Sequence, residues 1–86
     1  MTRNEIETEI RAALARLTEG PLGPIPLNAD LSDAIGLDSL GRLELLSEVE
    51  DRLDVTIYDV DSDKSATLAG MVDIVEAAVA DAKEPA

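Results

Sequence analysis

Apolar residues recur at intervals of three and four positions in three stretches of the chain, a spacing typical of amphipathic helices. The pattern predicts helices over about residues 2–18, 38–53 and 67–82. No stretch alternates between apolar and polar residues with comparable quality, so no strand is expected. We therefore predict an all-α fold, a three- to four-helix bundle. Ten apolar residues of these helices are expected to form its core: Ile6, Ile10, Leu14, Leu45, Leu46, Val49, Leu53, Leu68, Val72 and Val75.

Each predicted helix begins at a residue whose side chain can accept hydrogen bonds from the free N–H groups of the first turn. Thr2 stands three residues before Glu5, which is the spacing of a capping box. Asp38 or Ser39 can cap the second helix, and Thr67 can cap the last one. These caps set where the three helices are expected to start.

Two connections join the predicted helices. The first is a long loop over residues 19–37, in which we expect one helical turn near Asp30 to Ala34, started by Asp30 and closed by Gly36. The second is expected to contain a short helix over about residues 59–63. Three residues of the connections are expected to seal the core: Leu31, Ile35 and Tyr58.

Length and charge limit what the chain can do. Residues 1–86 are expected to form one domain, because a chain of this length can bury only one modest core, and residues 83–86 are expected to fray. Asp and Glu number 19 against 7 Lys and Arg, a net charge of −12. This charge disfavours nucleic acid and stable membrane association, and it favours basic patches on partner proteins. Without a long apolar run or a signal peptide, a cytoplasmic monomer is expected.

The predicted second helix has apolar residues on two faces. At about 100° per residue, Leu45, Leu46 and Val49 fall on one side, and Leu40 and Leu43 fall on the other. Exposed leucines are common in proteins, but these two lie close to Ser39 and favour a docking surface with an apolar centre and a polar rim. The rim is expected to comprise Glu44, Ser47, Glu48 and Asp51.

Two residues near the start of this helix, Arg42 and Ser39, need separate interpretation. Arg42 leans toward the core side and is expected to extend its charged end to water. A serine hydroxyl needs an adjacent base to act as a nucleophile, and the chain contains no histidine and no cysteine. Asp and Ser are ordinary helix caps, so the pair alone is weak evidence of function. We expect no catalysis by this chain, and Ser39 is better interpreted as the substrate of another enzyme.

The stretch Gly36-Leu37-Asp38-Ser39-Leu40 resembles the phosphopantetheine attachment signature of the acyl carrier proteins. The resemblance extends to the helix order and the acidity of nearly the whole chain. It implies a helical bundle of acyl-carrier type with a long loop between helices 1 and 2 and a short helix 3.

The same resemblance implies a carrier function. A phosphopantetheinyl transferase would move 4′-phosphopantetheine from coenzyme A to Ser39, which Asp38 and Leu40 flank. The thiol of the arm would then present acyl groups as thioesters to acyl-activating, condensing or acyltransferase enzymes with basic docking patches. The docking residues implied are Leu40, Leu43, Glu44, Ser47, Glu48, Asp51, Asp59 and Asp61.

Two departures from the family pattern bear on the pathway. Gly41 stands where many fatty-acid carriers have an acidic residue, and Ser47 stands where a larger apolar residue is frequent. They favour a dedicated carrier of polyketide, lipopeptide or fatty-acid-like biosynthesis. A discrete aminoacyl or peptidyl carrier of a nonribosomal pathway is the alternative.

Two interpretations from other classes are weaker. Asp59-x-Asp61-x-Asp63 imitates the start of a calcium-binding loop, but Lys64 and Gly70 stand where such a loop needs glycine and glutamate, so no metal site is predicted. A purely structural helical module would explain the outward leucines but not the serine motif.

Overall fold

The computed structural model describes residues 1–18, 23–58 and 63–83. Within these ranges the chain is helical, with one isolated bridge between Asp30 and Thr67 and no longer strand pairing. The helices are α1 (Arg3–Leu17), α2 (Leu31–Ile35), α3 (Ser39–Leu53), the 3₁₀ helix η1 (Lys64–Ala66) and α4 (Leu68–Lys83). The all-α bundle predicted from the sequence is confirmed. None of the helices in these ranges has the length and apolar character needed to cross a bilayer.

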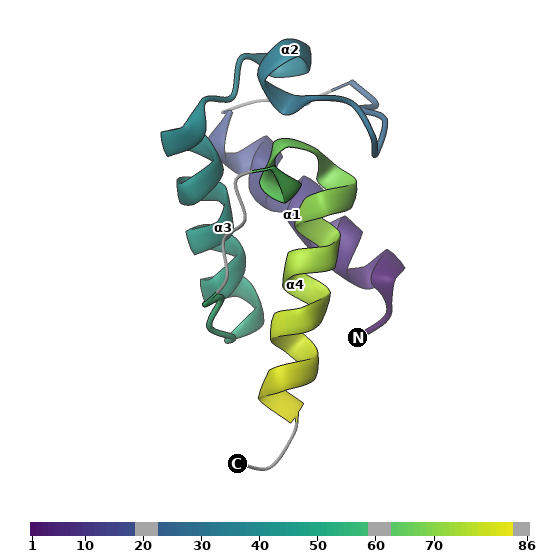
Figure 1. Ribbon diagram of the computed structural model, residues 1–86, viewed down its shortest axis with the longest axis vertical. Helices are drawn as coiled ribbons and strands as arrows, with labels where there is room; N and C mark the ends of the chain where they lie inside the picture. Colours follow the sequence, from purple (N-terminus) through teal and green to yellow (C-terminus); the bar gives the residue numbers. More distant parts are fainter. Residues whose placement is uncertain (19–22, 59–62, 84–86) are drawn as a thin grey trace.

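The three long helices enclose the core. α1 packs against both α3 and α4, and α2 lies across the end of the bundle at which α3 and α4 begin (Figure 1). Nine of the ten predicted core residues are buried, and the tenth, Leu53, is half-buried at the edge of the core. Burial of a large aliphatic side chain contributes roughly 1.5–3 kcal/mol, so this cluster is the main source of stability. Further core residues are Ala13, Ile25, Leu31, Ile57, Met71, Ile74, Ala78 and Val79.

The prediction that Tyr58 seals the core is wrong. Its side chain is 87% exposed, and the preceding residue, Ile57, is buried instead. The Ile57 N–H donates a hydrogen bond of 2.8 Å to a carboxylate oxygen of Glu50, which fixes this connection against α3. An isoleucine can be buried without a polar partner, whereas a buried tyrosine usually needs one for its hydroxyl. Leu31 is fully buried as expected, and Ile35 packs against the core while half-buried.

The long connection is not a simple loop, because it contains α2. Asp30 caps this helix: one of its carboxylate oxygens accepts hydrogen bonds from the N–H groups of Ser32 and Asp33, at 2.8 and 3.2 Å. Gly36 ends it in the left-handed region, with φ at 69°, which glycine adopts without a steric penalty. The single helical turn expected between Asp30 and Gly36 is therefore present.

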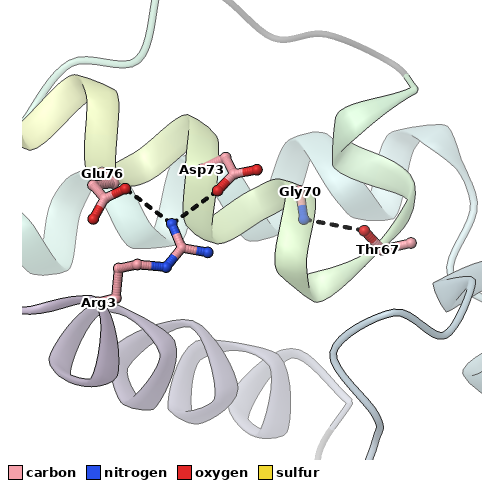
Figure 2. Close-up of polar contacts among 5 residues, drawn as sticks. All are labelled: Arg3, Thr67, Gly70, Asp73 and Glu76. Atoms are coloured by element: carbon pink, nitrogen blue, oxygen red, sulfur yellow. Dashed lines mark hydrogen bonds and ion pairs between the residues drawn. The ribbon is translucent and has the colours of Figure 1, made fainter.

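α4 begins in a tight junction with η1. The Gly70 N–H donates a hydrogen bond of 3.0 Å to the Thr67 hydroxyl, the expected N-cap (Figure 2). A Cβ on Gly70 would lie 1.7 Å from the backbone oxygen of Lys64, so only glycine allows η1 to approach α4 this closely. The short helix predicted over 59–63 falls mostly outside the described residues, and η1 follows directly after that range.

An ion-pair cluster joins the start of α1 to the middle of α4. The Arg3 guanidinium donates to carboxylate oxygens of Asp73 and Glu76, at 2.8 and 2.9 Å (Figure 2). The hydrogen bond to Asp73, and after it the one to Glu76, raises the pKa of the Arg3 guanidinium. All three side chains are about half exposed, so the pairs orient the two helices more than they stabilise them.

Candidate functional site

Ser39 is the first residue of α3, and its side chain is exposed. Of the two expected caps, the structure selects Asp38, whose carboxylate accepts a hydrogen bond of 2.8 Å from the Gly41 N–H. The Ser39 hydroxyl is therefore not engaged in capping and projects from the first turn of the helix. Asp38 therefore satisfies a free backbone N–H group of the first turn, and the Ser39 side chain remains accessible.

The preceding helix fixes the position of this turn. The N–H of Gly36 donates to the carbonyl of Ser32 at 2.9 Å, and the N–H of Leu37 donates to the carbonyl of Leu31 at 3.2 Å. Because Leu31 is fully buried, these bonds tie the residues just before Asp38 to the core. The exposed serine is therefore presented from an anchored backbone.

Gly41 accommodates the side chain of Leu37. A Cβ on Gly41 would lie 2.7 Å from the Leu37 Cδ1 atom, so its absence lets the Leu37 side chain lie over the first turn of α3. Leu37 is half-buried and packs against the core. In the sequence alone, Gly41 appeared only as the absence of an acidic residue that is frequent at this position. Its packing role depends on a contact with a residue outside the helix.

Arg42 is turned toward the serine. Its Nη2 atom donates a hydrogen bond of 3.2 Å to Ser39 Oγ, across one turn of the helix. Its Nε atom is buried and has no hydrogen-bond partner among the residues that the structure describes. The sequence predicted a side chain that leans toward the core and extends its charged end to water, and the structure agrees: Arg42 is half-buried as a whole, and the contact of its Nη2 atom with Ser39 is exposed. The sequence did not predict that this end would lie against the Ser39 hydroxyl. The i, i+3 spacing of an arginine and a serine was the signal that could have indicated this contact.

The outward apolar face lies next to this turn. Leu40 is 63% exposed and Leu43 is 52% exposed, whereas Leu45, Leu46 and Val49 of the same helix are buried. The two exposed leucines thus face away from the core, as the helical projection predicted. Three of the polar residues expected around them are exposed: Glu44, Ser47 and Asp51.

The other expected rim residues are placed differently. Glu48 is half-buried, and its carboxylate faces the Arg16 side chain of α1 at 3.6 Å. Asp59 and Asp61, predicted as docking residues, lie outside the described residues. The structure therefore brings together a continuous group on α3 alone, which we call the α3 surface: Ser39, Leu40, Leu43, Glu44, Ser47 and Asp51.

The chemistry available at Ser39 is limited to that of an acceptor hydroxyl. The chain has no histidine or cysteine, and the hydrogen-bond partner of Ser39 Oγ is a guanidinium, which cannot act as a base. Among the described residues, no three acidic side chains are grouped so that they could hold a metal ion. The site is thus suited to receive a group from outside.

Comparison with known families gives one match that covers most of the chain. Residues 8–75 match the family described as "Phosphopantetheine attachment site". This range extends from the first turns of α1 to the middle of α4, and it includes Ser39 and the whole of α3.

Curated relatives are similar over comparable lengths. An "Acyl carrier protein" of Exiguobacterium sp. is 32% identical over 76 residues, which cover 88% of this chain and 96% of the relative. An "Acyl carrier protein" of Exiguobacterium sibiricum is 29% identical over 79 residues, 92% of this chain and 100% of the relative. An "Acyl carrier protein" of Streptomyces coelicolor is 32% identical over 65 residues, 76% of this chain and 67% of the relative.

Proposed function

Because the chain belongs to the acyl carrier protein family, whose members bear a covalent 4′-phosphopantetheine arm, we propose that Ser39 is the residue to which this arm is attached. The observation that carries the proposal is the exposed Ser39 hydroxyl on the first turn of α3, within Asp38-Ser39-Leu40. Members of this family carry acyl groups and are not themselves catalysts, which agrees with the absence of histidine and cysteine from the sequence.

The residues around Ser39 fit the group that it would receive. A phosphodiester on Oγ would lie at the N-terminal end of α3, where the free N–H groups and the helix dipole favour negative charge. The Nε atom of Arg42 is buried and has no hydrogen-bond partner among the described residues, so it is a donor that such an anion could satisfy. When attached, the arm supplies the terminal thiol that carries the acyl group as a thioester.

Attachment needs a transferase, because this chain has no base for the step. The new bond joins Ser39 Oγ to the phosphorus atom of the arm, and the bond from that phosphorus to the nucleotide half of coenzyme A breaks. The hydroxyl proton passes to a base of the transferase. In the structure, Oγ accepts its hydrogen bond from Arg42, so the hydroxyl hydrogen remains available to that base.

The α3 surface is the proposed docking site for the transferase and for the synthase enzymes that use the arm. Leu40 and Leu43 provide an exposed apolar centre, and Glu44 and Asp51 provide negative charge around it. A partner that presents basic side chains around an apolar pocket would match this surface in charge and shape. The net charge of −12 would speed the encounter with such a partner.

For the cargo, we propose acyl groups of a specialised biosynthetic pathway, of polyketide, lipopeptide or fatty-acid-like type. Gly41 leaves the first turn of α3 without an acidic residue, which supports a set of partners distinct from those of a general fatty-acid carrier. We further propose that residues 1–86 act as one carrier unit.

Incubation with a promiscuous phosphopantetheinyl transferase and coenzyme A tests the attachment. Wild-type protein should gain the mass of one arm, Ser39→Ala should gain none, and Ser32→Ala, which alters an exposed serine of α2 outside the α3 surface, should gain the same mass as wild type. A folded wild-type protein that gains no mass would contradict the proposal. The modified protein can then be offered to acyl-activating and amino-acid-activating enzymes, and its intact mass would identify the class of cargo.

A further inference from the structure

We propose that Arg42 binds the phosphodiester that joins the arm to Ser39 and thereby holds the first segment of the arm against α3. The inference rests on the proposed function, because the phosphodiester exists only when Ser39 carries the arm. It assigns a positioning role to a residue that lies outside the five-residue attachment motif. Three features of Arg42 support it: the position of its side chain, the lack of an ion pair with any described carboxylate, and the chemistry of its guanidinium.

The geometry places the guanidinium at the point of attachment. Arg42 lies three residues after Ser39, a spacing at which two side chains share one face of a helix. Its Nη2 atom is 3.2 Å from Ser39 Oγ, the atom to which phosphorus would be bonded. Non-bridging phosphate oxygens would lie next to Oγ, within reach of the same guanidinium without any movement of the backbone.

Arg42 differs from the other arginines in its charge environment. Each of the other arginines forms an ion pair with at least one carboxylate: Arg3, Arg11, Arg16 and Arg52. In the part of the chain that the structure describes, no carboxylate forms an ion pair with Arg42. This is unexpected in a protein with 19 acidic residues. The start of a helix also disfavours a cation, because the helix dipole is positive there.

The unsatisfied donor points to the same conclusion. The Nε atom of Arg42 is buried and makes no hydrogen bond within the described residues. A buried donor without a partner is costly, so such groups usually have an acceptor when the protein is in its working form. In that form, the guanidinium of Arg42 would gain an anionic partner.

A phosphodiester suits this guanidinium better than the hydroxyl does. Arginine presents its N–H groups as a planar fork that can donate two parallel hydrogen bonds to phosphate oxygens. The single neutral oxygen of Ser39 cannot accept both of these parallel hydrogen bonds. Attachment of the arm would therefore replace one neutral hydrogen bond by charge-assisted bonds, and Nε would obtain a partner.

The consequence is a defined direction for the arm. Without a cation, the phosphodiester would be repelled by nearby acidic residues of the α3 surface, such as Glu44. With Arg42 bound to it, the first segment of the arm would lie along α3, beside the residues proposed to dock partners. Arg42 would thus determine where the thiol is presented.

Nuclear magnetic resonance of the wild-type protein before and after modification provides the first test. Attachment is first verified by intact mass. On attachment, the Arg42 Nε–Hε signal should move downfield, its exchange with water should slow several-fold, and a coupling across the hydrogen bond to ³¹P should become detectable. An Arg42 signal that is unchanged in fully modified protein would overturn the inference.

Variants provide the second test. In modified Arg42→Gln, the ³¹P resonance should shift from its wild-type position, and contacts between the first segment of the arm and α3 should be lost. Arg42→Lys, which keeps the charge but not the fork, should give an intermediate result. Arg16→Gln, which removes one arginine from the far end of α1, should match wild type. A ³¹P signal that is the same in wild type and Arg42→Gln would overturn the inference.

The two proposals fail in different ways. Protein that never gains the mass of the arm contradicts the attachment at Ser39 and, with it, the inference about Arg42. Protein that gains the mass but shows no response at Arg42 contradicts only the inference. If Arg42→Gln does not fold, the wild-type comparison before and after modification still decides.

Discussion

α4 and the N-terminal half of α3 share a capped start and a helical spacing of apolar residues, but they differ in whether those apolar residues are buried. Both helices begin at a capped turn and carry apolar residues at helical spacing. In α4 the large apolar residues are buried, including Leu68, Met71 and Val75. In the first half of α3, Leu40 and Leu43 are exposed. Packing therefore explains the sequence of α4, whereas the start of α3 contains residues that packing does not explain.

The glycines of the two helices show the same difference. Gly70 of α4 faces the backbone of Lys64, which cannot move without displacing η1. Gly41 of α3 faces the end of the Leu37 side chain, which can rotate. The contact at α4 is thus fixed by the fold, and the one at α3 can adjust. Substitutions that separate these two situations can test the comparison.

A large loss of stability is expected for Gly70→Ala. The new methyl group would overlap the Lys64 carbonyl, and we expect a loss of about 3 kcal/mol in the free energy of unfolding, at the upper end of overpacking effects. Gly41→Ala is the matched control, because rotation of Leu37 and a gain in helix propensity of up to about 1 kcal/mol should make it nearly neutral. Denaturant unfolding measures both values. Equal losses in the two variants would show that the α3 turn is as tightly packed as the α4 junction.

Two leucine substitutions in α3 distinguish residues that stabilise the fold from residues that contact partners. Leu45→Ala removes a fully buried side chain and should cost about 2–5 kcal/mol of stability. Leu43→Ala removes a side chain that is 52% exposed and should leave the unfolding free energy almost unchanged. It should slow transfer of the arm about tenfold, the effect of a single interface contact worth ~1.4 kcal/mol. Time-resolved intact mass measures the transfer. Marked destabilisation by Leu43→Ala would contradict the assignment of the two faces.

The helices and the two faces of α3 followed from the sequence because they depend on local patterns. Periodicity predicted three helices close to the ranges of α1, α3 and α4, and the capping residues gave their starting points. The turn between Asp30 and Gly36 also followed, because a side-chain cap and a left-handed glycine are local signals.

The features that the sequence did not predict depend on where individual side chains lie, which the periodicity of the helices does not specify. The sequence could not show which of Tyr58 and Ile57 is buried, because the connection that contains them has no repeating pattern of apolar residues. The partner of Arg42 depended on its rotamer, and the role of Gly41 depended on Leu37. Glu48 turned toward Arg16 of another helix, which the projection of α3 alone could not show.

The caps allow a finer test of the comparison. Thr67→Ala and Asp38→Ala each remove one acceptor from a helix start and should each cost about 1 kcal/mol of stability. Only Asp38→Ala should also lower the rate of attachment at Ser39, because it loosens the turn that presents the hydroxyl. Melting curves and mass measurements on the same samples give both quantities. An equal loss of attachment rate in Thr67→Ala would indicate a general effect of instability.

The smallest effect is expected from the arginines. Arg3→Gln removes the pairs with Asp73 and Glu76 and should lower the melting temperature slightly at low salt and not at high salt, because these exposed pairs are screened. In unmodified protein, Arg42→Gln should lower it less, since no described carboxylate pairs with Arg42. The raised pKa of Arg3 means that its contribution is fully present below the ordinary pKa of arginine and is lost only at higher pH. The difference between wild type and Arg3→Gln should therefore be constant across neutral pH, and a change between about pH 6 and about pH 9 would contradict the pairing seen at the start of α1.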